Sequence, residues 1–188
     1  MMARFQGDCS TILFCRNKIL AADQGFLCRS YGTMQRASHP EVIMSGIGNY
    51  LKGDFAQCNK LFYKTCELQV AHADAQAALA MQEFSTALER HMQIEERIVF
   101  SAFDATCGRG GSPTKALRVE HMAIRDQLRR MRNALDAHHG HAFLLHADGM
   151  RLQLWHHAHK ENFELLPRFE QTLATRQVEL LEAMEHFP

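Results

Sequence analysis

Net charge is the first thing that this sequence lacks. Its 188 residues carry 21 Lys or Arg against 21 Asp or Glu, so the formal charge is zero when histidine is neutral. Nucleic acids and anionic membrane surfaces attract proteins that carry excess positive charge. We therefore expect no nucleic-acid partner. The length predicts one domain, because domains commonly contain about 100 to 200 residues.

Long apolar runs are also absent. The run Thr11–Cys15 ends at Arg16, whereas a membrane-spanning helix needs about 18 apolar residues and a secretory signal about 7 to 15. We therefore expect no membrane partner and no export.

The six cysteines form no Cys-x-x-Cys pair, and the chain lacks the cysteine density of a small disulfide scaffold. Reduced thiols are the better interpretation, because disulfides are rare in reducing compartments. Together with the absence of an export signal, this predicts a cytoplasmic protein.

The first 43 residues differ from the rest because they show no sustained helical or alternating period. Three interpretations are open: a flexible tail, a targeting peptide, or residues translated from an upstream start when the natural start is Met44. We favour the third. The predicted division is an N-terminal extension over 1–43 and a helical domain over 44–188.

From Ser45 onward the apolar residues recur every three or four positions, which predicts helices. Asp74 is expected to cap the second helix, Ser112 and Pro113 to open the third, and Pro167 to end the fourth. A short helix is expected near 176–184. The inward positions are expected to be Leu51, Phe55, Cys58, Phe62 and Cys66, then Leu79, Phe84, Leu88, His91, Glu95 and Ile98, then Leu117, His121, Ile124, Leu128, Met131 and Leu135, and finally Met150, Leu154, His157, Glu161 and Leu165. Four such helices with short connections predict an all-α, antiparallel up-down-up-down bundle.

Histidine is abundant, and two of the inward faces carry it in one pattern. The chain has 12 histidines, and His91 and Glu95 repeat the four-residue spacing of His157 and Glu161. Residues at i and i+4 lie on one face of a helix, so each pair presents a nitrogen and a carboxylate to one point. A buried, ionised carboxylate is costly unless it is paired or binds a metal. With His121 inward on another helix, the pattern predicts a metal site in the core.

The donor set favours iron. Three imidazoles and two carboxylates suit a first-row metal, and two bridging carboxylates suit a pair of irons. A structural zinc is less natural, because it commonly takes cysteine ligands.

The sequence words HMQIEERIVF (91–100), RVEHMAIRDQL (118–128) and HAHKENFELLP (157–167) resemble those of the hemerythrin-like HHE cation-binding domains. The resemblance covers about residues 45–185. It implies a four-helix bundle with two non-haem irons that binds or senses dioxygen. It also implies His91, His121 and His157 as terminal ligands, with Glu95 and Glu161 bridging the irons.

The sequence departs from that family at two positions. The first helix of such domains carries a ligand histidine where this chain has Phe55, and hemerythrins proper carry a second histidine where it has Arg125. Water could take the open positions, one iron could bind better than the other, or the site could be degenerate.

Other polar residues near the motifs have simpler interpretations. Glu96 and Glu120 are expected beside the ligands or toward solvent, because adjacent helical positions face about 100° apart. His156 and His159 are expected in solvent, and Cys58 as a core thiol. The histidines of 138–146 are expected in a solvated connection.

Three functions follow as hypotheses. The leading one is a non-enzymatic protein with two irons that binds or senses dioxygen or a related small oxidant. The second is an enzyme or repair factor that reduces peroxide or nitric oxide, or donates iron. The third is an interaction bundle whose metal site has decayed at Phe55.

Overall fold

The computed structural model describes residues 46–107 and 114–188. Within these ranges the elements are helical and no strand occurs, which confirms the all-α prediction. The prediction for residues 1–43 and the Ser112–Pro113 cap lie outside the described residues. None of the described helices is both long and apolar enough to cross a membrane.

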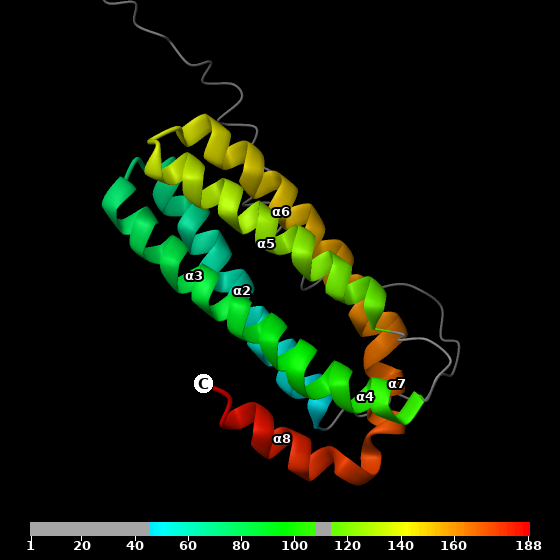
Figure 1. The fold of residues 1–188 in the computed structure, drawn as a ribbon. Coiled ribbons are helices and arrows are strands. Elements are labelled where there is room, and N and C mark those ends of the chain that lie inside the picture. The colour runs from blue at the N-terminus through cyan, green and yellow to red at the C-terminus, as the bar shows by residue number, and fades with distance from the viewer. Residues whose placement is uncertain (1–45, 108–113) are drawn as a thin grey trace, which may run out of the picture. The chain divides into compact units, whose positions relative to one another are not determined.

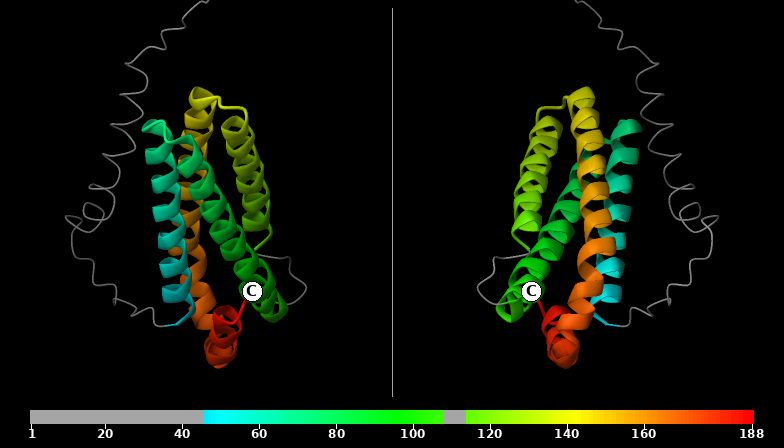
Figure 2. Two further views of the ribbon diagram at one scale, coloured as in Figure 1. Left: turned by 90° about the vertical axis from the view of Figure 1, so that its left-hand side faces the viewer. Right: turned by 90° about the vertical axis from the view of Figure 1, so that its right-hand side faces the viewer.

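Four long helices of the described part lie side by side, as Figures 1 and 2 show. They are α2 (Ile47–Val70), α3 (Asp74–Ile94), α5 (Lys115–Asp136) and α6 (Gly140–Lys160). α2 packs along α3 and α5 along α6, while contacts of α3 with α5 and of α2 with α6 complete the ring. The pair of α2 and α3 thus packs against the pair of α5 and α6 around one core.

Most of the predicted inward positions are buried. All six predicted positions of α5 are buried, and so are all five predicted on α6 and its continuation. The prediction for Leu79 is wrong, because its side chain is 64% exposed and Ala77, Ala80 and Met81 occupy the inner face of that part of α3. Ile98 is only partly buried, and the next residue, Val99, takes the inward position.

The two long helix pairs turn in the same way. α2 ends at Val70, His72 has a φ of 55°, and α3 begins at Asp74. α5 ends at Asp136, His138 has a φ of 54°, and α6 begins at Gly140. Asp74 is therefore the first helical residue and not the cap, since Ala73 holds the N-cap position without a side-chain hydrogen bond. His141 and His146, expected in the connection, lie in α6.

Both helices that carry a His-x-x-x-Glu pair widen into a π-helical stretch that begins at the glutamate. Glu95–Val99 leads into α4 (Phe100–Cys107), and Glu161–Leu165 leads into α7 (Leu166–Thr172). The prediction that the fourth helix ends near Pro167 is wrong. Pro167 lies in the first turn of α7, where its missing N–H leaves no helical hydrogen bond unmade.

The chain ends in a 3-10 turn, Ala174–Arg176, followed by α8 (Gln177–Glu185), near the helix predicted for 176–184. α8 buries Leu180 and Met184 in a core shared with α2, α4 and α7. Tyr50 Oη donates a hydrogen bond of 2.9 Å to the Met184 carbonyl oxygen. The last helix is thereby fixed to the start of α2.

Candidate metal centre

The structure brings together all five residues predicted to bind metal. Each residue is buried, with a relative exposure of 0 to 5%. Their donor atoms form two groups, within each of which the atoms lie less than 4.8 Å apart. The first donor group is Glu95, His121 and His157; the second donor group is His91, Glu95 and Glu161.

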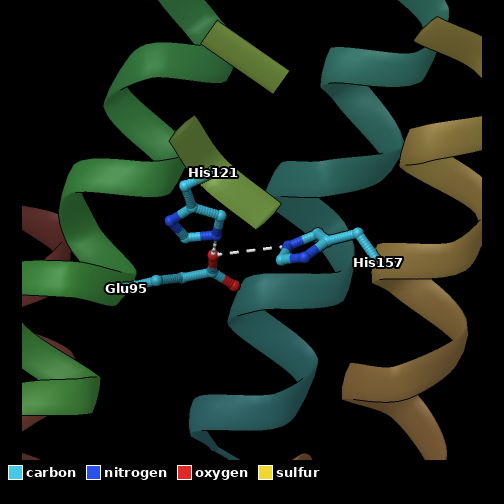
Figure 3. Close-up of side chains that lie close together, drawn as sticks. All are labelled: Glu95, His121 and His157. Carbon is cyan, nitrogen blue, oxygen red and sulfur yellow. Dashed lines mark ion pairs between the residues drawn. The ribbon is translucent and has the colours of Figure 1, made fainter. Parts of the chain in front are cut away.

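The first donor group joins α5 and α6 to the π-helical stretch after α3 (Figure 3). Glu95 Oε2 lies 3.1 Å from His121 Nε2 and 3.7 Å from His157 Nε2. Both imidazoles therefore aim their Nε2 atoms at one carboxylate oxygen.

The second donor group is centred on His91, whose Nε2 lies 3.4 Å from Glu95 Oε1. Glu161, which completes this group, also has its Oε2 atom 3.5 Å from His157 Nε2. Glu95 thus presents one oxygen to each group, and Glu161 lies between His91 and His157. Glu95 therefore belongs to both donor groups, and Glu161 belongs to the second.

A carboxylate from another element fixes the orientation of each imidazole. Nδ1–H of His91 donates to Asp54 at 2.9 Å, that of His121 to Glu96 at 2.8 Å, and that of His157 to Glu120 at 3.2 Å. A carboxylate can only accept, so the proton is held on Nδ1. This leaves Nε2 to face the centre, the arrangement by which proteins orient histidine ligands.

Each of these three carboxylates also faces a cation. Asp54 pairs with Arg90 at 3.4 Å, Glu96 with Arg125 at 2.8 Å, and Glu120 with Lys160. Hydrogen bonds from His157 and Lys160 lower the pKa of Glu120 to about 2. Hydrogen bonds from Arg125 and His121 also lower the pKa of Glu96, so Glu96 and Glu120 stay ionised at neutral pH.

Without a metal, His91 and Glu161 hold protons and Glu95 is ionised. Burial lowers the pKa of His91, but the neighbouring Glu95 charge and the hydrogen bond to Asp54 together outweigh burial and raise that pKa to about 10. Burial raises the pKa of Glu95, yet the His91 charge and the other polar groups of the centre together hold it well below its usual value. Burial and the Glu95 charge raise the pKa of Glu161 well above its usual range. A metal ion would replace these protons.

The side chains at the centre fit a metal ion. The Nε2 atoms of the three histidines, both oxygens of Glu95 and Oε1 of Glu161 are buried without a hydrogen-bond partner among the described residues. Buried polar atoms are nearly always paired, so a cluster of unpaired nitrogen and carboxylate donors needs an explanation. Imidazole and carboxylate together are a donor set of first-row metals.

The residues that depart from the family pattern lie beside this cluster. The Phe55 ring is 5.4 Å from that of His91 and 6.4 Å from that of His157, measured between centroids. Arg125 belongs to neither donor group and forms ion pairs with Glu89 and Glu96. Cys58 is buried and belongs to neither donor group, and burial raises the pKa of its thiol to about 12.

Several predictions about neighbouring residues are confirmed. Glu96 and Glu120 lie beside the histidines as expected, and His156 and His159 are exposed. The sequence interpretation missed Asp54 and Arg90. The available signal was the position of Asp54, directly before the residue where a ligand histidine was expected.

The class of protein follows from this geometry: a helical bundle with a buried histidine and carboxylate cluster able to hold metal. The family model of the hemerythrin HHE cation-binding domain matches residues 54–169, and the chain belongs to this family. The resemblance inferred from the sequence is therefore confirmed. No match to a curated protein or to a solved structure was found.

Proposed function

We propose that this protein binds iron, with two ions per chain at saturation, and that it binds or senses dioxygen or a related small oxidant. The observation that carries the proposal is the pair of buried donor groups that share Glu95. Within the bundle, we propose that the four long helices alternate in direction as an antiparallel up-down-up-down bundle. Such bundles commonly place carboxylate and histidine ligands on facing helices.

The proposal assigns a role in iron binding to each side chain of the centre. Bound ferrous iron would supply the electrons that reversible dioxygen binding requires. Glu95 and Glu161 would be the bridging ligands and the histidine Nε2 atoms the terminal donors, while Asp54, Glu96 and Glu120 accept the Nδ1 hydrogen bonds. Phe100, stacked on His121 with centroids 5.7 Å apart, helps to exclude water.

The proposal is for binding without turnover, in the cytoplasm and without a nucleic-acid or membrane partner. The zero net charge supports the absence of a nucleic-acid partner. Peroxide or nitric oxide reduction that disappears in Glu161→Ala would replace the binding role with an enzymatic one.

The test is reconstitution with Fe²⁺ under anaerobic conditions, followed by elemental analysis and optical spectra in air and after dithionite. We expect about two irons per chain, as in bundles with two bridging carboxylates, and near-ultraviolet bands that respond reversibly to air. Protein that stays free of iron, with an unchanged melting temperature in Fe²⁺, would overturn the proposal.

Adjacent histidines provide a matched control. His157 is buried in the first donor group, whereas its neighbour His156 is exposed. His157→Ala should lower the iron content and abolish the optical response, and His156→Ala should leave both unchanged. Equal loss in the two variants would show that iron binds on the surface and not at the centre.

A further inference from the structure

Two halves of the described chain repeat at an offset of 66 residues. The first hairpin is α2 with α3 and its continuation, and the second hairpin is α5 with α6 and its continuation. The histidines with positive φ are at 72 and 138, the buried motif histidines at 91 and 157, and the glutamates that begin the π-helical stretches at 95 and 161. Each pair differs by 66 positions.

The hydrogen bonds that orient the histidines obey the same offset. Asp54 accepts from His91 in the first hairpin, and Glu120 accepts from His157 in the second. Both pairs are separated by 37 residues. The repeat therefore extends from the backbone to the side chains that surround the centre.

This repeat pairs Phe55 with His121. His121 supplies an imidazole to the first donor group, but the second donor group contains one imidazole and two carboxylates. The Phe55 ring lies against His91 at the corresponding place. The second donor group is thus the image of the first with one nitrogen donor replaced by an apolar ring.

The repeat also identifies the partner that the missing imidazole would need. Glu96 accepts from His121 Nδ1 at 2.8 Å, and the residue 66 positions after Glu96 is Asn162. Asn162 Oδ1 is buried and has no hydrogen-bond partner in the described part of the chain. Asn162 lies in the π-helical stretch between α6 and α7, and both of these helices contact α2, which carries Phe55. A hydrogen-bond acceptor is therefore present on the side of the bundle where a histidine at position 55 would need one.

We infer that the two metal positions are unequal: the first donor group binds metal tightly, and the second is a weaker position rich in carboxylates. At the second position Phe55 stands where the repeat places an imidazole, and the Oδ1 acceptor of Asn162 has no such imidazole to bind. This inference rests on the proposed metal-binding function. It sets an order of loading, with the first donor group filled before the second. Because imidazole favours iron and zinc whereas carboxylate favours manganese and magnesium, the second position is also the less selective for iron.

The test is an anaerobic titration of metal-free protein with Co²⁺, followed by calorimetry and by the visible spectrum. Wild-type protein should bind one equivalent tightly and a second at least about tenfold more weakly, because even indirect partners of a ligand change affinity by about 10- to 100-fold. Phe55→His should bring the two affinities within a few-fold of each other. Phe55→Leu, which removes the ring without adding a donor, should keep the wild-type ratio.

Two further variants use the repeat directly. His121→Phe should make the first position as weak as the second. Phe55→His combined with Asn162→Leu should lose part of the gain of Phe55→His, because the new imidazole then lacks its acceptor. Circular dichroism and melting temperature establish that each variant folds, and Phe55→Leu tests the inference even where a histidine is not accommodated.

The outcomes separate this inference from the proposed function. Two equal, tight equivalents of Co²⁺ in the wild-type protein would overturn the inference and leave metal binding intact. The same ratio in wild-type and folded Phe55→His protein would overturn it as well. Failure of the wild-type protein to bind any Co²⁺ or Fe²⁺ would instead overturn the proposed function.

Discussion

The first and second hairpins share the same backbone arrangement but differ in the surroundings of their glutamates. In each, a left-handed histidine turns the chain, a buried His-x-x-x-Glu pair faces the centre, and the helix widens at the glutamate. π-Helical turns are rare and occur frequently at functional sites. Their occurrence at both glutamates indicates that the backbone of each hairpin is shaped around its carboxylate.

The difference lies in the surroundings of the two glutamates. Glu95 belongs to both donor groups and is held ionised by the His91 charge, whereas Glu161 belongs to one group and keeps its proton. Without metal, the repeated local motif thus yields one ionised and one protonated carboxyl group, because each of two close carboxylates disfavours the ionisation of the other.

The largest expected effect comes from changing the two glutamates separately. Glu95→Gln should weaken both metal positions by more than about 100-fold, since even partners outside the ligand set contribute 10- to 100-fold. Glu161→Gln should weaken the second position more than the first, because Glu161 belongs to the second donor group alone. Co²⁺ titration measures both, and equal losses in the two variants would contradict the asymmetry.

Glu161→Gln also serves as its own folding control. The amide has nearly the shape of the protonated carboxyl that Glu161 carries without metal. We therefore expect the melting temperature of metal-free Glu161→Gln to stay close to that of the wild-type protein.

The next effect concerns the carboxylates that orient the histidines. Asp54→Asn should weaken metal binding at the second donor group, and Glu120→Gln at the first, each by about 10- to 100-fold. The reason is that an amide can present N–H to Nδ1 and no longer enforces the proton there. Calorimetric titration of each variant measures the change, and Asp148→Asn, at an exposed ion pair with Arg151, is a surface control.

The metal affinity should increase as the pH rises. Because the pKa of His91 is raised to about 10 without metal, its ring is protonated at pH 7 and must lose that proton to bind. Glu161, whose pKa is also raised, releases a second proton. Affinity should therefore rise between pH 6 and about 8 with proton release, measured by calorimetry in buffers of different ionisation enthalpy.

A pH-independent affinity would contradict this assignment of protons. The comparison also predicts which variant changes the dependence. Glu161→Gln removes one titrating group and should reduce the number of protons released at a given pH.

The smallest expected effect, a change in stability, tests whether the turns of the two hairpins are equivalent. His72 and His138 hold left-handed backbone conformations at φ of 55° and 54°. A residue with a Cβ in the left-handed conformation is disfavoured by about 1–2 kcal/mol, and replacing it with glycine removes this cost. Part of the gain is lost because glycine gives up more conformational freedom on folding. His72→Gly and His138→Gly should each raise stability by up to about 1 kcal/mol. Urea unfolding measures this, and opposite signs at the two turns would show that the turns are not equivalent.

Much of the bundle and its centre could be predicted from the sequence because the signal is local. The four-residue spacing placed His91 with Glu95 and His157 with Glu161, and helical phase placed His121 inward. Where prediction failed, the cause was a change of local geometry. The π-helical stretch Glu95–Val99 shifts the helical phase, so Val99 is buried in place of Ile98. The other stretch, Glu161–Leu165, leads into α7, so the helical structure continues past Pro167.

The sequence by itself determined the helical faces, the candidate donors and the absence of a histidine at position 55, because each depends on residue type and on spacing within one helix. Only the tertiary structure decided that Glu95 serves two donor groups, that Asp54 orients His91, and that Asn162 Oδ1 lacks a partner. These relations join residues on different helices. Their distances are set by how the helices pack, which no periodicity within a single helix encodes.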